Sequence, residues 1–351
     1  MSRVRSSLAD LLVDPVTGGD LRMEAEQTDD RGDVIEGRLL GKDGIAYPVR
    51  DGIPRFVGAD GPDSQVAASF GYKWSQRSSY QAPKFATWYR SWLLEKYGFS
   101  DEARLRTYFS RFQRVLEVGC GSGMSSVISL DGLRADQHWL GLDLSTAIDV
   151  ARERLGGRPN TEFVQADALA LPFREGTFDA VFSEGVLHHT PSTRAALASV
   201  VSILSPGGEV MFYVYRVKAP LREYTDDMLR DRLSGLPPAE AWEMMAPLTG
   251  LAKALADLHA TVQVPEDVPL LGIKAGTYDV QRLIYWHFAK LFWSDDLGFE
   301  GSQHVNFDWY HPRFAHRHSE DEVRGWCEEL RLSIVHFDVQ DSGFTVRAVK
   351  G

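Results

Sequence analysis

The middle of the chain alternates between short apolar runs and longer segments of mixed polarity. The apolar runs are too short for buried helices and are typical of strands that are covered on both faces of a sheet. They end near residues 118, 143, 166, 183 and 215. A parallel, doubly wound α/β sheet is therefore predicted for residues 111–217.

The end of the chain resumes this pattern. Ser319 followed by Glu322 predicts the start of a helix that runs to about Leu330. Apolar segments at 334–339 and 344–349 then predict an antiparallel pair of strands. Residues 316–351 are therefore expected to complete the sheet that begins at residue 111.

A strong stop signal precedes the fifth strand. Residues 205–208 read Ser-Pro-Gly-Gly. They are expected to form a turn that separates a helix over about 192–204 from a strand over 209–215.

Three other regions lie outside this alternation. Residues 1–58 indicate a small β-rich domain, residues 59–110 a helical lid or linker, and residues 218–315 a helical insertion after the fifth strand. Within the insertion, residues 281–293 are apolar nearly all round. Such a helix must be buried on several sides, so it is expected to line a pocket, to pack against a second subunit, or both.

A glycine-rich turn follows the first strand. Val115–Val118 leads into glycines at 119, 121 and 123, which predicts a place where backbone approaches a ligand closely. The next apolar run ends in Asp143, and an acid at the tip of a second strand can bind both hydroxyls of a ribose. The glycine spacing fits neither the dinucleotide fingerprint nor a phosphate-binding loop.

The pattern E-x-G-x-G-x-G, with an acid after the next strand, resembles the class I S-adenosylmethionine-dependent methyltransferases. Leu171-Pro172-Phe173 followed by Phe178-Asp179 is typical of the subgroup that acts on small molecules, and Leu204–Gly208 matches the turn before strand five in that family. The resemblance implies a Rossmann-like seven-stranded sheet and S-adenosylmethionine as the cofactor.

The resemblance also implies which residues hold the cofactor. Glu117 would set the loop and the methionine end, the three glycines would let the cofactor lie against backbone, Asp143 would hold the ribose, and Asp167 would bind the adenine amino group. The complete set of expected cofactor residues is Glu117, Gly119, Cys120, Gly121, Gly123, Asp143, Leu144, Asp167, Ala168 and Ser183.

The first 58 residues carry a second resemblance. The Asp-Pro-x-Thr-Gly turn at Asp14 and the segment Tyr47–Pro54 are similar to the small zinc-ribbon-like domain that activates tRNA methyltransferases. The cysteines of the metal-binding form are missing here. The region is therefore interpreted as a packing or docking module.

Candidate catalytic residues follow the fourth strand. Glu184, His188 and His189 lie just past its end, where open α/β sheets bind their ligands. An acceptor amine or hydroxyl must lose a proton, and histidine or a carboxylate is the usual agent. Alternatively, the histidines pack near the cofactor without acting as bases, and Glu184 binds a cationic acceptor.

Candidate substrate residues come from two regions. Tyr72 and Trp74 lie in an aromatic segment that either covers the ligands as a lid or packs on the sheet as an amphipathic helix. The second region is dense in polar and aromatic side chains, and its expected substrate contacts are Asp308, Tyr310, His311 and Arg313. In an alternative reading, Asp308 and Arg313 pair with each other.

A metal site is not predicted. His304, His311, His316 and His318 are close in sequence, but they lack an established ligand spacing. The only cysteines, Cys120 and Cys327, support no disulfide framework.

The composition of the chain limits the classes of binding partner that are expected. The 351 residues carry a formal net charge of -11, which disfavours nucleic acid as the main partner because phosphate neutralisation dominates that affinity. No apolar run reaches the length of a membrane span, and no signal peptide is recognised, so a cytoplasmic protein without membrane contact is expected.

The sequence favours methyl transfer to a nitrogen or oxygen of a small-molecule metabolite, in a biosynthetic pathway and as a homodimer. One alternative is a tRNA-modifying methyltransferase with a fused activator-like domain. Another is a regulatory protein that binds S-adenosylmethionine without turnover.

Overall fold

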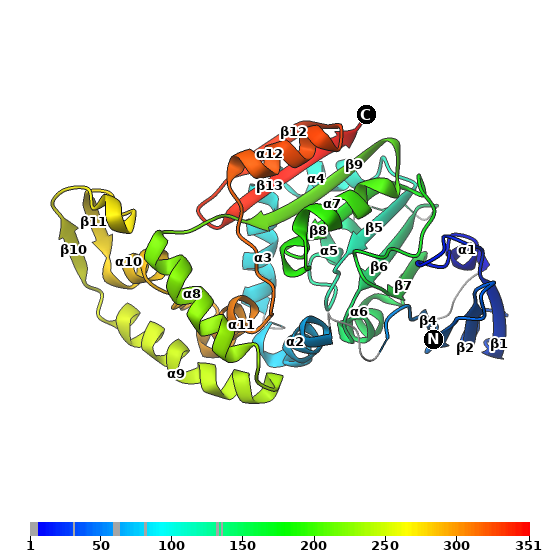
Figure 1. Cartoon of the computed structure of the whole chain (residues 1–351), viewed down its shortest axis with the longest axis horizontal. Helices are drawn as coiled ribbons and strands as arrows, with labels where there is room; N and C mark the ends of the chain where they lie inside the picture. The colour runs from blue at the N-terminus through cyan, green and yellow to red at the C-terminus, as the bar shows by residue number, and fades with distance from the viewer. Residues whose placement is uncertain (1–5, 31, 59–63, 81–82, 131–132, 135) are drawn as a thin grey trace.

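The computed structural model describes residues 6–30, 32–58, 64–80, 83–130, 133–134 and 136–351. Figure 1 shows three parts along the long axis of the molecule. A small N-terminal sheet lies at one end, a mostly helical insertion lies at the other, and the large sheet lies between them.

The large sheet has seven strands in the order β12-β13-β9-β8-β5-β6-β7. Strands β5 to β9 are parallel to one another, and β13 runs antiparallel between β9 and β12. This order confirms the predicted doubly wound, Rossmann-like fold. The strands are β5 Arg114–Val118, β6 His138–Asp143, β7 Thr161–Gln165, β8 Phe178–Glu184, β9 Leu204–Tyr215, β12 Leu332–Val339 and β13 Gly343–Lys350.

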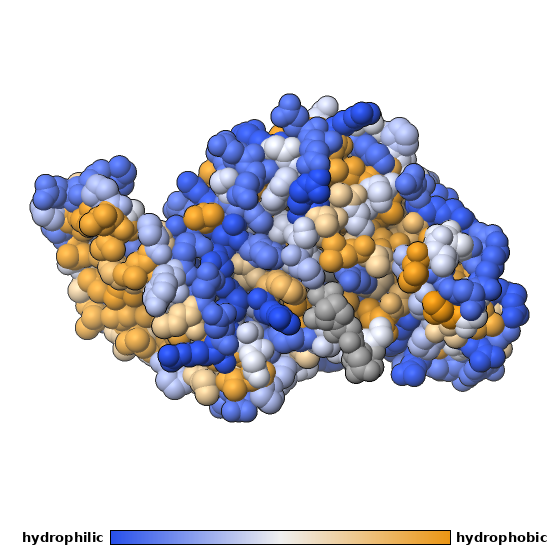
Figure 2. Space-filling model, viewed as in Figure 1, coloured by the Kyte–Doolittle hydropathy of each residue, from blue (hydrophilic) through white to orange (hydrophobic). Residues whose placement is uncertain are grey.

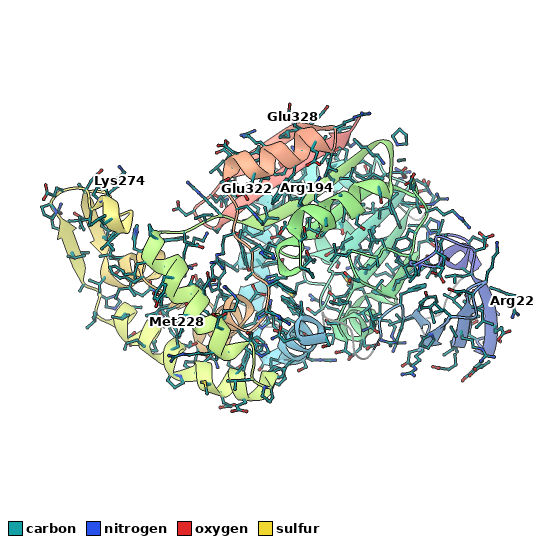
Figure 3. All side chains as sticks on the ribbon, viewed as in Figure 1. Arg22, Arg194, Met228, Lys274, Glu322 and Glu328 are labelled. Carbon is teal, nitrogen blue, oxygen red and sulfur yellow. The ribbon has the colours of Figure 1, made fainter. Side chains whose placement is uncertain are left out.

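Helices cover both faces of this sheet. Successive side chains of a strand point to opposite faces, so Val115 packs in one apolar cluster with α4 and α6, whereas Leu116 packs in another with α7 and α12. The helices of the core are α4 Glu102–Phe109, α5 Ser126–Leu130, α6 Ala147–Leu155, α7 Thr193–Ser202 and α12 Glu320–Glu329. The predicted capping box of Ser319 and Glu322 is present at the start of α12, where Figure 3 labels Glu322.

The stop signal at residues 205–208 lies inside a strand. Helix α7 ends at Ser202, and β9 begins at Leu204 instead of 209. The pairing of β9 with β8 changes register between the pair Phe178 and Leu204 and the pair Ala180 and Glu209. The extra residues of β9 in this stretch form a bulge. Gly207 has a φ of 76°, a conformation that glycine adopts without strain.

The N-terminal region contains a four-stranded antiparallel sheet, and it docks on edge strand β7. Its elements are α1 Ser6–Ala9, β1 Arg22–Thr28, β2 Val34–Leu40, β3 Ala46–Arg50 and β4 Ile53–Pro54. Beyond β4, the Phe56 amide donates to the Gln165 carbonyl of β7 at 2.7 Å. The Arg55 guanidinium pairs with Asp149 of α6 at 2.7 Å.

The remaining elements surround the carboxyl ends of the parallel strands. Before the sheet come α2 Ser64–Ser75, η1 Arg77–Ser79 and α3 Pro83–Lys96. The insertion between β9 and α12 contains α8 Pro220–Leu233, α9 Pro238–Asp257, β10 Thr261–Val264, η3 Pro269–Leu271, β11 Gly276–Asp279, α10 Val280–His287 and α11 Gly298–Tyr310.

The apolar segment 281–293 is helical only as far as His287. Side chains replace the backbone bonds that a longer helix would make: Gln281 donates to the Leu291 carbonyl at 2.6 Å, and Asn306 accepts from the Phe292 amide at 3.0 Å. The region dense in polar and aromatic side chains, which contains Asp308, Tyr310, His311 and Arg313, begins within α11 and continues beyond its end at Tyr310.

Apolar side chains gather on the surface of the insertion (Figure 2). Met244 and Leu251 of α9, and Leu258 just after it, are each more than half exposed, at 55%, 52% and 61%. Lys274, near β11, and Arg22, on β1, lie at opposite ends of the molecule (Figure 3). No helix within the described ranges is both long enough and apolar enough to cross a bilayer.

Candidate active site

A cavity of about 530 Å³ lies beyond the carboxyl ends of the parallel strands. One end is bounded by Gly119, Asp143 and Asp167, which lie at the carboxyl ends of β5, β6 and β7. The other end is bounded by the insertion, including Trp286 and Trp309. Ligands of open α/β sheets bind at this position, where the strand order reverses beside the first strand.

The glycine turn forms part of the cavity floor. Gly119 and Gly121 have φ angles of 74° and 54°, in the left-handed region. A Cβ atom would lie 2.3 Å from the Val186 side chain at Gly119 and 2.8 Å from the Trp74 ring at Gly121. Both positions therefore require glycine, because of their backbone conformation and because a side chain would clash. The contact between Gly121 and Trp74 also places α2 directly over the turn.

Asp143 is held rigidly at the tip of β6. It accepts hydrogen bonds from the Gly121 amide at 2.8 Å and from the amide and hydroxyl of Ser145 at 2.8 and 2.7 Å. Burial raises the pKa of this carboxyl, while those donors act in the opposite direction. A carboxylate has about four acceptor positions, so one remains for a ligand hydroxyl.

Asp167 gives the same end of the cavity a second acid. One of its oxygens accepts from the Leu169 amide at 2.8 Å, and the residue lines the wall together with Leu144 and Ala168. Two acids that follow neighbouring strands suit the hydroxyls of a ribose and the amino group of an adenine. These residues therefore fit S-adenosylmethionine.

Four other residues expected at the cofactor lie beneath the floor. Glu117 is fully buried, accepts from the Ser125 hydroxyl at 2.5 Å and has a pKa that burial raises to about 8. The Ser183 hydroxyl donates to the Val118 carbonyl at 3.2 Å. Cys120 is buried in the core, and Gly123 packs against Leu155. These positions shape the turn from below.

Glu184 lies on the cavity wall with its charge already balanced. Its carboxylate pairs with the Lys96 ammonium and accepts from the Tyr97 hydroxyl at 2.6 Å. Lys96 is fully buried between the rings of Trp92 and Tyr213, at 3.6 and 3.5 Å. Burial lowers the pKa of Lys96 to about 8, although Glu184 opposes that shift.

The two histidines differ in position. His189 lines the cavity, and its Nδ1 is 2.6 Å from the Phe314 carbonyl, which can only accept, so the remaining lone pair is on Nε2. Burial lowers the pKa of His189 to about 4, so the ring is neutral at pH 7. His188 lies behind the wall, fully buried, with its ring centroid 3.7 Å from that of Tyr215.

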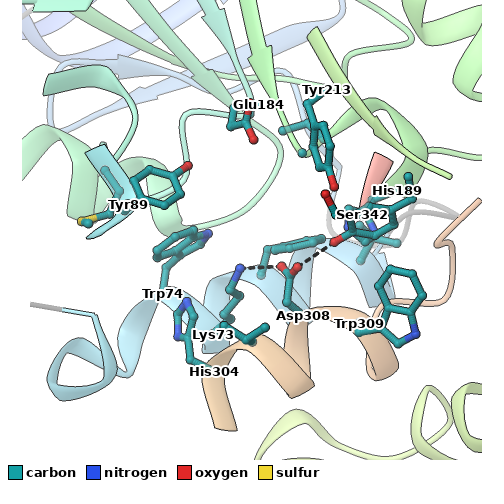
Figure 4. Close-up of a pocket in the computed structure, with 18 of the residues that line it drawn as sticks. Lys73, Trp74, Tyr89, Glu184, His189, Tyr213, His304, Asp308, Trp309 and Ser342 are labelled. Carbon is teal, nitrogen blue, oxygen red and sulfur yellow. Dashed lines mark hydrogen bonds and ion pairs between the residues drawn. The ribbon is translucent and has the colours of Figure 1, made fainter. Parts of the chain in front are cut away.

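A polar group closes the cavity between α2 and α11 (Figure 4). Asp308 pairs with Lys73 at 2.5 Å and accepts from the Tyr215 hydroxyl at 2.9 Å. Burial alone would raise the pKa of Asp308, but the charges of Lys73 and Lys290 hold it below its usual range. Asp308 therefore pairs with Lys73 and not with Arg313.

Trp74 and Asp308 line the cavity, while four other expected substrate residues lie outside its wall. Tyr72 packs against Trp242 and Phe307. The Tyr310 hydroxyl donates to Asp226, and His311 hydrogen-bonds Ser69. Arg313 is exposed. Their contacts join α2, α8 and α11, so they position the wall without forming it.

Much of the wall was not predicted from the sequence. Its far end includes Lys218, Arg222, Tyr285, Trp286 and Lys290. Lys290 has apolar residues on both sides, from Phe288 to Phe292, and a cation in such a setting is a signal that a buried polar site lies there. No group of three or more His, Cys, Asp or Glu side chains in the described part of the chain could hold a metal ion.

Comparisons with known proteins agree with this geometry. Residues 116–212 match a family model described as a methyltransferase domain. The chain is 27% identical over 238 residues to the tRNA (carboxymethyluridine(34)-5-O)-methyltransferase alkbh8 of Xenopus tropicalis, covering 65% of this chain and 34% of that protein. It is 33% identical over 128 residues to phthiotriol/phenolphthiotriol dimycocerosates methyltransferase 1 of Mycobacterium ulcerans, covering 36% of this chain and 47% of that protein.

Among solved structures, the chain is similar to the trans-methyltransferase CalH in complex with SAH, with a TM-score of 0.40 and 17% identity over 71% of this chain and 55% of that one. The chain spans about a third of the first curated relative and less than half of the second. The matched segment contains the glycine turn, Asp143 and Asp167. Residues 116–212 therefore form an S-adenosylmethionine-dependent methyltransferase domain.

Proposed function

We propose that this chain methylates a nitrogen or oxygen atom of a small-molecule acceptor. The observation that carries the proposal is the single cavity, which continues from the cofactor residues of the sheet to a second compartment walled by the insertion. S-adenosylmethionine supplies a methyl group on a sulfonium that an acceptor lone pair can displace. The chain supplies alignment of the two ligands and exclusion of water.

His189 is the side chain best placed to take up the acceptor's proton. Its ring lines the cavity and is neutral at pH 7, and its Nε2 has no hydrogen-bond partner among the described residues. Glu184 is less suited because Lys96 and Tyr97 already occupy its oxygens. His188 lies too deep to reach an acceptor without rearrangement of the wall.

A nucleic-acid acceptor is the second candidate. The similarity to an alkbh8 tRNA methyltransferase favours it, as does the resemblance of the first 58 residues to an activator domain. The net charge of -11 and the enclosure of the acceptor compartment by α8, α10 and α11 favour a small molecule instead.

A calorimetric titration with S-adenosylmethionine and S-adenosylhomocysteine tests the cofactor site. We expect the wild type to bind both, and Asp143→Ala to weaken binding at least about tenfold because the charged acceptor of the ribose hydroxyls is lost. Asp136→Ala, which removes a carboxylate outside the cavity, is the matched control and should bind like the wild type.

An assay of methyl transfer from labelled S-adenosylmethionine then distinguishes a small-molecule acceptor from a tRNA acceptor. Label should enter a metabolite extract free of nucleic acid and should not enter total tRNA. Label in tRNA alone would replace the small-molecule proposal with the second candidate, and binding without transfer to either would favour a regulatory role.

A further inference from the structure

Four cationic side chains surround the far end of the cavity. We call this group the cation pocket: Lys218, Arg222, Arg282 and Lys290. Lys218, Arg222 and Lys290 all face the Trp309 ring, with charged groups 5.9, 5.4 and 4.6 Å from its centroid. Arg222 and Arg282 share the Tyr285 ring in the same way, at 4.6 and 5.5 Å.

Three acids near the cation pocket are already engaged, and a fourth, Asp341, lines the same cavity. Asp226 accepts four hydrogen bonds, from the Arg222 guanidinium, the Lys290 amide, the Trp309 indole and the Tyr310 hydroxyl. Glu223 pairs with Arg317 at 2.7 Å, and Asp308 pairs with Lys73. Each of these three carboxylates therefore has its own cation.

Three cations of the pocket are left without such a partner. The Lys218 ammonium donates to the carbonyls of Asp341 and Ser342, and the Lys290 ammonium donates to the Val305 carbonyl at 3.1 Å. Within the described residues, neither lysine nor Arg282 has a carboxylate at ion-pair distance. The compartment thus holds an excess of positive charge.

This excess is costly to bury. Lys290 is only 5% exposed, and burial lowers its pKa to about 7. Burial also lowers the pKa of Lys218 well below its usual range, and the nearby Arg222 and Lys290 add to the shift. A bound anion would relieve both the desolvation and the mutual repulsion.

We infer that the cation pocket binds an anionic group, a carboxylate or a phosphate, on a flat apolar methyl acceptor. The rings of Tyr285, Trp286 and Trp309 would contact the body of that acceptor, while its charged end lies among the cations. The inference rests on the proposed function, because it specifies the acceptor for the same cavity. It replaces the alternative that Glu184 binds a cationic acceptor.

Three probes with the same phenol ring test the charge preference. They are 4-hydroxyphenylacetate, its neutral amide and tyramine, each titrated by tryptophan fluorescence with S-adenosylhomocysteine present. We expect the acid to bind about tenfold more tightly than the amide, and tyramine to bind most weakly. Phenyl phosphate, compared with the acid, distinguishes a phosphate from a carboxylate.

Arg282→Gln is the first variant to compare. Arg282 is exposed and its side chain makes no hydrogen bond to another described residue, so folding should be retained. This substitution should lower the affinity for 4-hydroxyphenylacetate about threefold and leave the affinity for its neutral amide unchanged. Arg232→Gln, on α8 but outside the cavity wall, is the matched control and should change neither.

The pH dependence provides a second readout. Several charged groups face Lys290. The cations are Lys73 of α2, Arg222 of α8 and Lys218 before α8, and the acids are Asp226 of α8 and Asp308 of α11. Because Lys290 loses its proton as pH rises through about 7, the affinity for the acid should fall between pH 6 and 8.5. Lys290→Gln should flatten that fall.

Equal binding of the three probes, or binding of none of them up to their solubility limits, overturns the inference. S-adenosylhomocysteine is titrated alone in the same series. Loss of that binding would defeat the proposed function itself, whereas normal binding without a preference for the anion would defeat only the cation pocket.

Discussion

Buried carboxyl groups at this site have pKa shifts of opposite sign. Glu117 lies beneath the glycine turn, where burial raises its pKa to about 8 and the main opposing contacts are hydroxyl donors. Asp308 is buried beside Lys73 and Lys290, whose charges outweigh the effect of burial. Glu117 is therefore largely protonated at neutral pH, and Asp308 is ionised.

Glu117→Gln should make stability less dependent on pH. The folded wild type keeps a proton that the unfolded chain releases above its ordinary pKa of 4.5, so wild-type stability should fall as pH rises from about 4.5 to about 8. The unfolding midpoint of the variant should therefore rise relative to that of the wild type across this range. Thermal melts at several pH values measure it, with the exposed Glu175→Gln as control. A constant difference across the range would contradict a raised pKa.

At the scale of residues, the sequence predicts best what immediately follows a strand. The sequence places Gly119, Asp143 and Asp167 at one edge of the sheet because each lies at the carboxyl end of a strand that the apolar pattern locates. Lys218 and Arg222 lie at the start of the insertion and Lys290 lies far later in it, so the three meet only through helix packing. Their common location was not predictable from local spacing.

The elements that close the cavity are connected by buried polar contacts. Helix α2 reaches α11 through Lys73 and Asp308, whose side chains are 9% and 21% exposed. Asp308 also binds Tyr215 at the end of β9. This pair therefore connects the covering helix, the insertion and the sheet.

Lys73→Met should destabilise the fold by about 3 kcal/mol because it leaves a largely buried carboxylate without its cation. Lys253→Met breaks an exposed pair with Asp257 on α9 and should cost about 0.5 kcal/mol or less. Urea denaturation measures both. The double variant Lys73→Met/Asp308→Asn should recover part of the loss, and a cost no greater than that of Lys253→Met would show that the pair contributes little.

At the scale of elements, some helix ends are determined by local sequence signals and others by tertiary contacts. The capping box of α12 is complete within four residues, so the sequence alone locates that helix start. The end of α10 is different, because Gln281 and Asn306 hold the chain after His287 in a non-helical path. Asn306 is far from that segment in sequence, and the apolar pattern therefore predicts a helix that is too long.

In the whole molecule, the N-terminal region is connected to the cofactor end of the cavity. Arg55 pairs with Asp149 and donates to the Gln165 side chain at 2.8 Å. Gln165 in turn donates to the Leu144 carbonyl at 3.0 Å, next to Asp143. The docking contact thus supports the loop that holds the ribose acid.

Arg55→Ala should lower the affinity for S-adenosylhomocysteine about threefold and the stability by about 1 kcal/mol, because Gln165 loses its partner and the loop after β6 gains freedom. Calorimetry and urea denaturation measure the two effects. Arg22→Ala, on β1 and exposed, is the control and should alter neither. An unchanged affinity would show that the N-terminal region packs on the sheet without supporting the cofactor site.

The position of that region has one more consequence. Strand β7 is the last strand of the seven-stranded sheet, yet all five of its residues are buried. Arg55 and Phe56 run alongside β7, and the Phe56 amide donates a hydrogen bond to the Gln165 carbonyl. A bare strand at the border of a sheet is a template on which other chains can add β-structure. The first four strands therefore also protect the protein against aggregation, by hiding the one parallel border that the fold would otherwise leave open.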